Sequence, residues 1–267
     1  MKLAQDIKKW ALILGSSSGF GAATAIELSR NGYNIFGVHL DRAATMPNVE
    51  RVIEQIKSNG VEVEFFNVNA ADHEKRKEVL DVIERKFQNE PSMIKVVLHS
   101  LAFGTLRPYI AENPDDQVTP KQMEMTLDVM AHSLVYWVQD LFHRKLIGKG
   151  TRIFAMTSEG STRVWAYYGP VSAAKAALES HIRQLAFELA KYGITVNGIR
   201  AGVTDTPALR KIPGNEQMIE YSLKRNPSGR LTTPEDVAKA IVHLSHDDMQ
   251  WVTGNIIGVD GGEFIAG

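Results

Sequence analysis

The chain has 267 residues, of which 44% are hydrophobic, and it carries 30 Lys and Arg against 31 Asp and Glu with no Cys. A chain of this length buries enough apolar surface to form its own core, as one large domain or two small ones. The lack of cysteine excludes disulfide scaffolds, zinc ribbons, iron–sulfur clusters and thiol nucleophiles, and the net charge of -1 argues against a nucleic-acid binder with a broad basic face.

No targeting or membrane-spanning segment is predicted. The apolar run near the N-terminus extends only from Trp10 to Leu14, which is too short for the core of a signal peptide. Nowhere do 18 apolar residues follow one another, as a spanning helix would require. We therefore expect a cytoplasmic protein without membrane insertion.

Short apolar runs alternate along the chain with longer segments of helical period. The runs are rich in Val, Ile and Phe and are bounded by Gly, Asn, Ser or Asp, which predicts buried strands at residues 11–14, 34–40, 61–68, 94–98, 152–156, 194–199 and 255–259. Helices are predicted between them at residues 21–31, 47–59, 72–89, 120–146, 170–191 and 234–245. This alternation predicts an α/β fold, a single doubly wound domain over residues 1–267, with a seven-stranded parallel sheet and helices on both faces.

Several helix ends carry local signals. Three helices begin at Thr119-Pro120, Gly169-Pro170 and Thr233-Pro234, where proline suits the first helical position. Gly32, Gly60 and Gly193 follow helices as C-terminal caps. The least structured stretch is residues 201–231, and we expect a substrate lid at about residues 206–231.

A glycine-rich turn joins the first strand to the first helix. Such a turn lets the backbone approach a pyrophosphate, which then lies on the helix N-terminus. The spacing is GxxxGxG rather than GxGxxG, and glycines that only serve the packing of a tight turn are the alternative. If the turn binds a dinucleotide, its contacts come from Gly15, Ser17, Ser18, Gly19, Phe20 and Gly21.

Further polar motifs follow the later strands in order. Asn69 and Ala70 follow the third strand, and His99-Ser100-Leu101-Ala102 closes the fourth. Ser158, Tyr168 and Lys175 follow the fifth strand, Gly202, Val203 and Thr206 follow the sixth, and Asp260-Gly261-Gly262 ends the seventh.

With these motifs in this order, the chain resembles the short-chain dehydrogenase/reductase family over nearly its whole length, which implies a Rossmann-type domain. Within that family it is most similar to the bacterial enoyl-[acyl-carrier-protein] reductases. Ketone-reducing members have Asn-Asn-Ala-Gly at the position of residues 99–102, and their catalytic tyrosine lies four residues before the lysine, where this chain has Val171. Here the tyrosine lies seven residues before Lys175, which is the enoyl-reductase spacing.

The resemblance implies a role for each catalytic residue. Tyr168 hydrogen-bonds the thioester oxygen and stabilises the enolate, while Lys175 holds the nicotinamide ribose and lowers the pKa of the tyrosine. Ser158 lines the site, and its importance stays open because some enoyl reductases carry a second tyrosine there. Val203 and Thr206 fix the carboxamide, and Met130 stands where ketone reductases have a catalytic asparagine.

The displaced tyrosine also has a chemical interpretation. On a helix, offsets of four and seven residues return near the same face, the second about 4.5 Å further along the axis. Hydride delivered to the β-carbon of an enoyl thioester leaves the carbonyl oxygen two bonds beyond that carbon, so a displaced tyrosine suits this oxygen. Tyr167 is the neighbouring alternative, and the seven-residue interval favours Tyr168.

The choice between NADH and NADPH stays open. The usual position for an acid after the second strand is His39, with Asp41 and Arg42 just beyond it. Asp41 suits the ribose hydroxyls of NADH, whereas Arg42 suits a 2′-phosphate. Many NADPH-dependent relatives carry a basic residue at the position of Ser18.

The sequence thus predicts an NAD(P)H-dependent enoyl-[acyl-carrier-protein] reductase of fatty-acid elongation. The alternatives are a carbonyl or alcohol oxidoreductase of the same family, such as a 3-oxoacyl thioester reductase, and a non-catalytic dinucleotide-sensing protein. No metal site is expected, because a solvated helix end explains the histidines and aspartates of residues 243–248 better. The family's long helices imply a homotetramer or dimer.

The lid has its own charge bias. Residues 206–231 hold five basic residues against two acidic ones, a balance of 5 - 2 = +3, and these are Arg210, Lys211, Lys224, Arg225 and Arg230 against Glu216 and Glu220. Because acyl-carrier protein is acidic, we expect it to dock beside the lid, with a solvated loop as the alternative.

Overall fold

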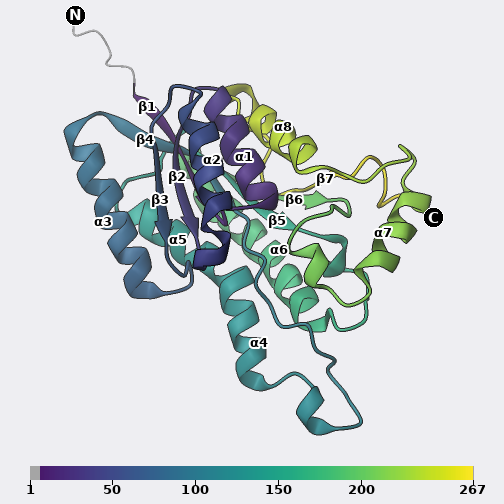
Figure 1. Ribbon diagram of the computed structural model, residues 1–267. Coiled ribbons are helices and arrows are strands. Elements are labelled where there is room, and N and C mark those ends of the chain that lie inside the picture. Colours follow the sequence, from purple (N-terminus) through teal and green to yellow (C-terminus); the bar gives the residue numbers. More distant parts are fainter. Residues whose placement is uncertain (1–6, 267) are drawn as a thin grey trace, which may run out of the picture.

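A parallel sheet of seven strands forms the centre of the computed structural model, which describes residues 7–266 (Figure 1). The strand order is β3-β2-β1-β4-β5-β6-β7, so the direction of winding reverses between β1 and β4. This confirms the predicted doubly wound α/β fold. The strands are β1 (Lys8–Leu14), β2 (Asn34–His39), β3 (Val63–Asn67), β4 (Ser92–His99), β5 (Arg152–Thr157), β6 (Thr195–Ala201) and β7 (Ile256–Val259).

Helices cover both faces of the sheet. One apolar core lies between the sheet and α1 (Gly19–Arg30), α2 (Met46–Lys57) and α8 (Pro234–Leu244). The other lies between the sheet and α3 (His73–Asn89), α5 (Ser133–His143) and α6 (Gly169–Leu189). Short 3₁₀ turns complete the connections at Ala43–Thr45, Pro114–Asp116, Glu159–Ser161, Ala190–Tyr192, Leu209–Lys211 and Asp247–Met249.

The first strand is deeply buried over its second part. Residues from Trp10 to Leu14 are fully buried, and the Trp10 ring stacks on Phe36 of β2 with ring centroids 4.0 Å apart. Full burial of one large apolar side chain contributes roughly 1.5–3 kcal/mol. The strand that leads into the glycine turn is therefore held rigidly on both faces.

The predicted helix ends are confirmed where the signal is local. Thr119 and Thr233 each form a capping box with the residue three positions later. Gly32, Gly60 and Gly193 have positive φ angles of 78°, 76° and 70°, as expected for glycines that end a helix.

The helix predicted over residues 120–146 is interrupted. It consists of α4 (Pro120–Leu127), a π-helical turn (Asp128–His132) and α5. The Ser133 hydroxyl donates to the carbonyl of Val129 at 2.7 Å within this turn. A π turn of this kind is frequent at functional sites, and α4 projects from the body of the molecule together with the segment before it (Figure 1).

The prediction that residues 201–231 form the least structured stretch is wrong in one respect. The segment expected to be least structured contains an eleven-residue helix, α7 (Asn215–Arg225), which lies beside the C-terminal end of the chain (Figure 1).

Among the described residues, no helix combines the length and apolar character needed to cross a membrane.

Candidate active site

The predicted site residues follow the carboxyl ends of six neighbouring strands. In a parallel sheet these ends share one edge, and the change of winding direction between β1 and β4 opens a crevice there. The glycine turn follows β1 and the Ser100 segment follows β4, so both line this crevice. The topology therefore brings the predicted cofactor residues together.

The glycine turn is too crowded for side chains. A Cβ atom on Gly15 would clash with the carbonyl of Ser100, and one on Gly21 would clash with the carbonyl of Gly15. Gly15 also has a φ of 91°, which favours glycine. A Cβ on Gly19 would lie 3.6 Å from Cγ2 of Thr206, so the loop after β6 lies against this turn.

The first turn of α1 leaves its amides without a side-chain cap. Ser18 occupies the N-cap position, but its side chain makes no capping hydrogen bond and the first turn holds no acid. An uncapped positive helix end beside a close-packed glycine backbone is the arrangement that binds a pyrophosphate. Ser17 and Phe20 lie in the same turn, so these residues fit the phosphates of a dinucleotide.

Asp41 is held firmly just after β2. Nδ1 of the buried His39 lies 2.9 Å from Oδ2 of Asp41, and the Asp41 amide donates to Oδ1 of Asn67 at 3.0 Å. Partial burial acts to raise the Asp41 pKa, but hydrogen bonds from Thr45, Ser17 and His39 outweigh it, and the pKa is lowered. Asp41 thus carries a fixed negative charge, supported by His39.

Arg42 differs from its neighbour. Its side chain is exposed, and it forms no ion pair among the described residues. At the end of β2 the structure therefore presents a fixed carboxylate, Asp41, and an exposed guanidinium, Arg42. The sequence left open which of the two contacts the cofactor.

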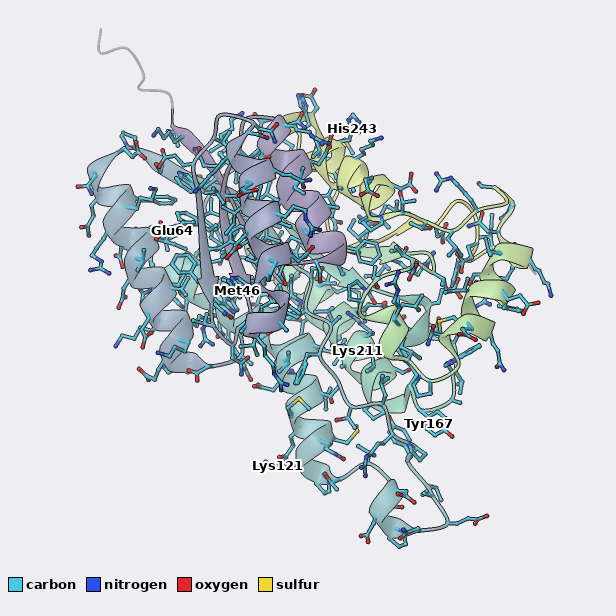
Figure 2. All side chains as sticks on the ribbon, viewed as in Figure 1. Met46, Glu64, Lys121, Tyr167, Lys211 and His243 are labelled. Atoms are coloured by element: carbon cyan, nitrogen blue, oxygen red, sulfur yellow. The ribbon has the colours of Figure 1, made fainter. Side chains whose placement is uncertain are left out.

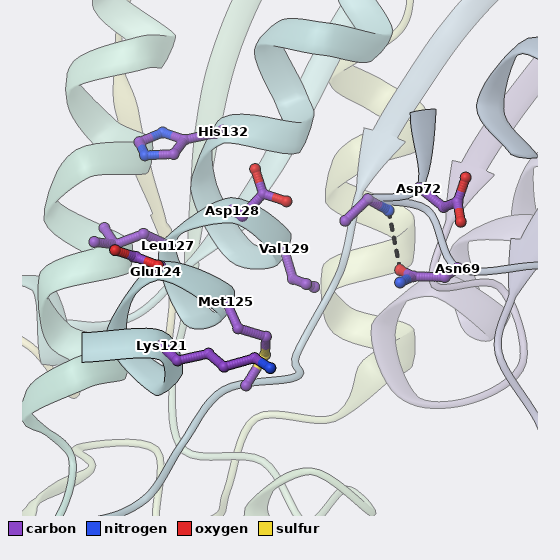
Figure 3. Close-up of a pocket in the computed structure, with 10 residues that line it drawn as sticks. Asn69, Asp72, Lys121, Glu124, Met125, Leu127, Asp128, Val129 and His132 are labelled. Carbon is purple, nitrogen blue, oxygen red and sulfur yellow. Dashed lines mark hydrogen bonds between the residues drawn. The ribbon is translucent and has the colours of Figure 1, made fainter. Parts of the chain in front are cut away.

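Asn69 and Ala70 line the next part of the edge. The side chain of Asn69 accepts a hydrogen bond from the amide of Ala71 at 3.0 Å, and the Ala70 carbonyl accepts one from Trp137 at 2.8 Å. Figure 3 shows Asn69 facing a hollow of about 560 Å³ whose other wall is α4 and the π turn. This hollow is lined by Lys121, Glu124, Met125, Asp128 and His132 but by none of the predicted catalytic residues.

The segment after β4 is tied to the π turn. The Ser100 amide donates to the carbonyl of Leu14 at 2.8 Å, which places Ser100, Leu101 and Ala102 beside the glycine turn. Nε2 of the buried His99 lies 2.8 Å from the Ser133 hydroxyl. Burial and the nearby Lys175 lower the pKa of His99 to about 3, so its ring is neutral at physiological pH.

Lys175 lies buried on α6. Its Nζ donates to the carbonyl of Met156 on β5 at 2.6 Å. Burial lowers its pKa to about 8, opposed by Glu179 one turn further along the helix. Glu179 in turn accepts a hydrogen bond from the Thr157 hydroxyl at 2.7 Å.

Tyr168 occupies the N-cap position of α6 and faces Ser158. The two hydroxyl oxygens are 3.5 Å apart. A Cβ on Gly160 would clash with the Tyr168 ring, so this glycine makes room for the tyrosine. Tyr167, by contrast, is 47% exposed with a φ of 63°, and Figure 2 shows it at the edge of the molecule.

The expected effect of Lys175 on the tyrosine is absent from this structure. Burial raises the Tyr168 pKa, with a smaller opposing effect from the Ser158 hydrogen bond. The reason is that the lysine ammonium is directed to the Met156 carbonyl. Tyr168 is therefore a protonated hydrogen-bond donor at neutral pH.

The two positions that depart from ketone reductases meet in one apolar cluster. Met130, on the π turn, and Val171, on α6, pack together with Val129 and Ala174, and Tyr168 lies at the cluster's edge. A Cβ on Gly104 would lie 2.9 Å from the Met130 sulfur and 2.8 Å from Cγ2 of Val171, so the loop after β4 closes over both. Apolar side chains thus pack together at the two positions where ketone-reducing members carry polar catalytic residues.

The loop after β6 is bonded to the C-terminal segment. The Val203 amide donates to the carboxylate of Glu263 at 3.2 Å. Glu263 also lies 2.7 Å from where a Gly202 Cβ would be. Thr206 is buried, and its hydroxyl accepts the Leu209 amide at 3.2 Å.

The basic lid surface predicted for carrier docking is mostly neutralised. Arg210 pairs with Asp205 at 2.7 Å, Lys224 with Glu220 at 2.6 Å and Arg230 with Asp236 at 2.6 Å. Arg225 is buried between Glu159 and Glu263. Of the five cations, only Lys211 forms no ion pair within residues 7–266 (Figure 2).

The sequence prediction missed Glu159, Glu263 and Arg225 as partners within the site. Glu159 directly follows Ser158 and Glu263 directly follows the Gly261-Gly262 pair, which is the only local signal that could have drawn attention to them. Their pairing with Arg225 depends on the fold and not on spacing.

Comparison with known proteins places this geometry in a family. The family model described as Enoyl-(Acyl carrier protein) reductase matches residues 15–263. The chain is 30% identical to the enoyl-[acyl-carrier-protein] reductase [NADH] FabI of Aquifex aeolicus over 184 residues, or 68% of this chain and 67% of that relative. It is 29% identical to the 3-oxoacyl-[acyl-carrier-protein] reductase FabG of Pseudomonas aeruginosa, over 97% of this chain and 98% of that one. The crystal structure of the Aquifex aeolicus enoyl reductase superposes with a TM-score of 0.83 at 25% identity, covering 97% of both chains.

Proposed function

Because the chain belongs to the enoyl-(acyl carrier protein) reductase family of short-chain dehydrogenases/reductases, we propose that it reduces the trans-2 double bond of enoyl thioesters with NADH as the preferred reductant. The substrate would be carried by acyl-carrier protein in fatty-acid elongation. A homotetramer or dimer and a cytoplasmic location stay predictions.

One observation carries the proposal. Tyr168 faces Ser158 at the start of α6, while Val171, four residues before the lysine, is buried against Met130. The positions that would serve a ketone reductase therefore hold packed apolar side chains, and the tyrosine that faces Ser158 stands seven residues before Lys175. This arrangement suits an oxygen remote from the carbon that receives hydride.

The residues supply binding and charge stabilisation. When bound, the dinucleotide supplies the hydride. The Tyr168 hydroxyl, kept protonated by its raised pKa, donates a hydrogen bond to the thioester oxygen as negative charge develops there. Lys175 binds the ribose hydroxyls with a charged ammonium, and Ser158 holds the tyrosine hydroxyl in place.

The choice of NADH rests on Asp41. Its carboxylate is fixed by His39 and by the backbone contact with Asn67 at the position where the adenosine ribose would lie. A fixed carboxylate accepts ribose hydroxyls and repels a 2′-phosphate. Arg42 is exposed and unfixed, so its side chain loses conformational freedom if it holds a phosphate.

Carbonyl reduction is the second candidate. The Ser158–Tyr168 hydroxyl pair, 3.5 Å apart, would also bind the oxygen of a ketone. Parallel assays of trans-2-enoyl and 3-oxoacyl thioesters with NADH separate the two candidates. Turnover of neither, with cofactor bound, would favour a dinucleotide-sensing protein. For carrier docking, Lys211 is the exposed lid cation without an ion pair in the part of the chain that the structure describes.

A further inference from the structure

A buried ion cluster joins three segments around the candidate active site. The Arg225 guanidinium lies 2.6 Å from Glu159 and 3.5 Å from Glu263. The side chain of Arg225 is 3% exposed and that of Glu263 fully buried. The cluster therefore belongs to the interior, unlike the other cations of the lid.

Each member of the cluster comes from a segment that borders the site. Glu159 directly follows Ser158, and Glu263 accepts the Val203 amide at the end of β6. Arg225 is the last residue of α7. One guanidinium thus connects the helix of the lid to the serine segment and to the loop after β6.

The C-terminal segment is held at the same place. Arg163 pairs with Glu159 at 3.3 Å and donates to the carbonyl of Phe264 at 3.1 Å. The Arg200 guanidinium lies over the Phe264 ring, 3.6 Å from its centroid. Phe264 is therefore held by both Arg163 and Arg200. Because Glu263 directly precedes it, Glu263 has little freedom to move if α7 moves away from the site.

The cluster is not an efficient source of stability. Nε and Nη1 of Arg225 are buried without a hydrogen-bond partner among the described residues, and the same guanidinium faces two carboxylates. Buried charges carry a desolvation penalty that apolar side chains of similar size avoid. A positional role accounts for this arrangement better than a stabilising one.

We infer that Arg225, through Glu159 and Glu263, is a positioning residue that latches α7 over the substrate side of the active site. Its kinetic consequence rests on the proposed reductase function. Through Glu159, which directly follows Ser158, the latch adjoins the thioester side of the site, so it acts on binding of the thioester more than on binding of the dinucleotide.

The test compares Arg225→Met with Lys224→Met in the full chain. The control removes a neighbouring cation whose partner, Glu220, is exposed on the same helix. Amide hydrogen exchange of residues 215–225 is measured on the free protein, and KM is measured with a short enoyl thioester free of carrier protein. Arg225→Met should accelerate α7 exchange about tenfold and raise KM about tenfold, with NADH affinity within roughly twofold of wild type. Lys224→Met should change none of these quantities.

Unchanged α7 exchange in folded Arg225→Met would overturn the latch, as would equal acceleration in Lys224→Met. If Arg225→Met fails to fold, Glu159→Gln replaces it, because it removes the carboxylate charge at the shorter of the two contacts with Arg225, 2.6 Å. Normal α7 exchange in Glu159→Gln would then overturn the inference. If the wild-type protein turns over no thioester, the reductase proposal fails. The exchange measurement still decides whether Arg225 holds α7 in place.

Discussion

Two adjacent tyrosines precede α6, and their surroundings differ sharply. Tyr168 is directed toward Ser158, whereas Tyr167 is half exposed in a left-handed backbone conformation. Tyr168→Phe removes the hydrogen bond that stabilises the enolate, and loss of such a donor costs about 10²–10³ in kcat. Steady-state enoyl reduction measures this loss.

Tyr167→Phe is the matched control, since it removes the same atom one residue away. It should retain near wild-type kcat, and both variants should bind NADH normally. Equal losses in the two variants would contradict the assignment of Tyr168.

Lys175 should set the alkaline limit of activity. Its pKa of about 8 means that the ammonium is charged below this pH and loses its proton above it. Since kcat/KM reports groups of the free enzyme, kcat/KM for NADH should fall about tenfold per pH unit above pH 8. An arginine at position 175 stays charged above pH 8. Lys175→Arg should therefore abolish the alkaline fall of kcat/KM, even if the activity of the variant is lower. A limb that begins only above pH 10 would point to Tyr168, whose pKa is raised.

Asp41 should decide the cofactor preference. Asp41→Asn removes the charge that repels a 2′-phosphate, so the ratio of kcat/KM for NADH over NADPH should fall about tenfold, or about 1.4 kcal/mol. Arg42→Ala serves as the control and should leave the preference for NADH intact. A wild-type preference for NADPH that collapses in Arg42→Ala would reverse this assignment.

Among the elements, the glycine turn combines packing with binding. A methyl group on Gly21 would clash with the Gly15 carbonyl, whereas one on Gly32 meets nothing within 4 Å. Gly21→Ala must therefore shift the turn and should weaken NADH binding at least about tenfold, which is 1.4 kcal/mol. Calorimetric titration with NADH measures this.

Gly32→Ala should leave NADH binding unchanged. The substitution strains a backbone with a positive φ angle and should lower the free energy of unfolding by about 1 kcal/mol. Urea unfolding measures this change. Normal NADH affinity in Gly21→Ala would show that the turn serves packing alone.

Helix boundaries were predictable where their signals are local. The caps at Thr119, Thr233 and the glycines arise from neighbouring residues. The π turn was not predicted: the residue after it, Ser133, contacts His99 across 34 positions, and such a contact leaves no signal in local spacing. The α7 helix was missed because Pro213 and Gly214 just before it and Pro227 just after it indicate turns.

At the scale of the whole molecule, the parallel doubly wound sheet and its shared edge followed from the alternation of strands and helices. The ion-pair partners of the charged residues could not be predicted from the sequence. The +3 balance of residues 206–231 omitted Asp205 and Asp236, which lie outside that window and neutralise Arg210 and Arg230. The burial of Arg225 depends on Glu263, 38 positions away.

The candidate catalytic residues Ser158, Tyr168 and Lys175 lie within one strand–helix unit, and the resemblance to the family pointed to them through their spacing. The sequence alone did not predict that the lysine ammonium binds the Met156 carbonyl, or that Val203 is engaged. Both contacts cross between elements, so spacing gives no signal for them.

The central claim is that the displaced tyrosine serves an enoyl thioester. It is tested most directly by following NADH oxidation with trans-2-enoyl and 3-oxoacyl thioesters of equal chain length, with wild type and Tyr168→Phe. We predict that wild type has a kcat/KM for the enoyl substrate at least about 10²-fold higher, and that Tyr168→Phe loses that advantage. Faster reduction of the 3-oxoacyl substrate by wild type would contradict the account.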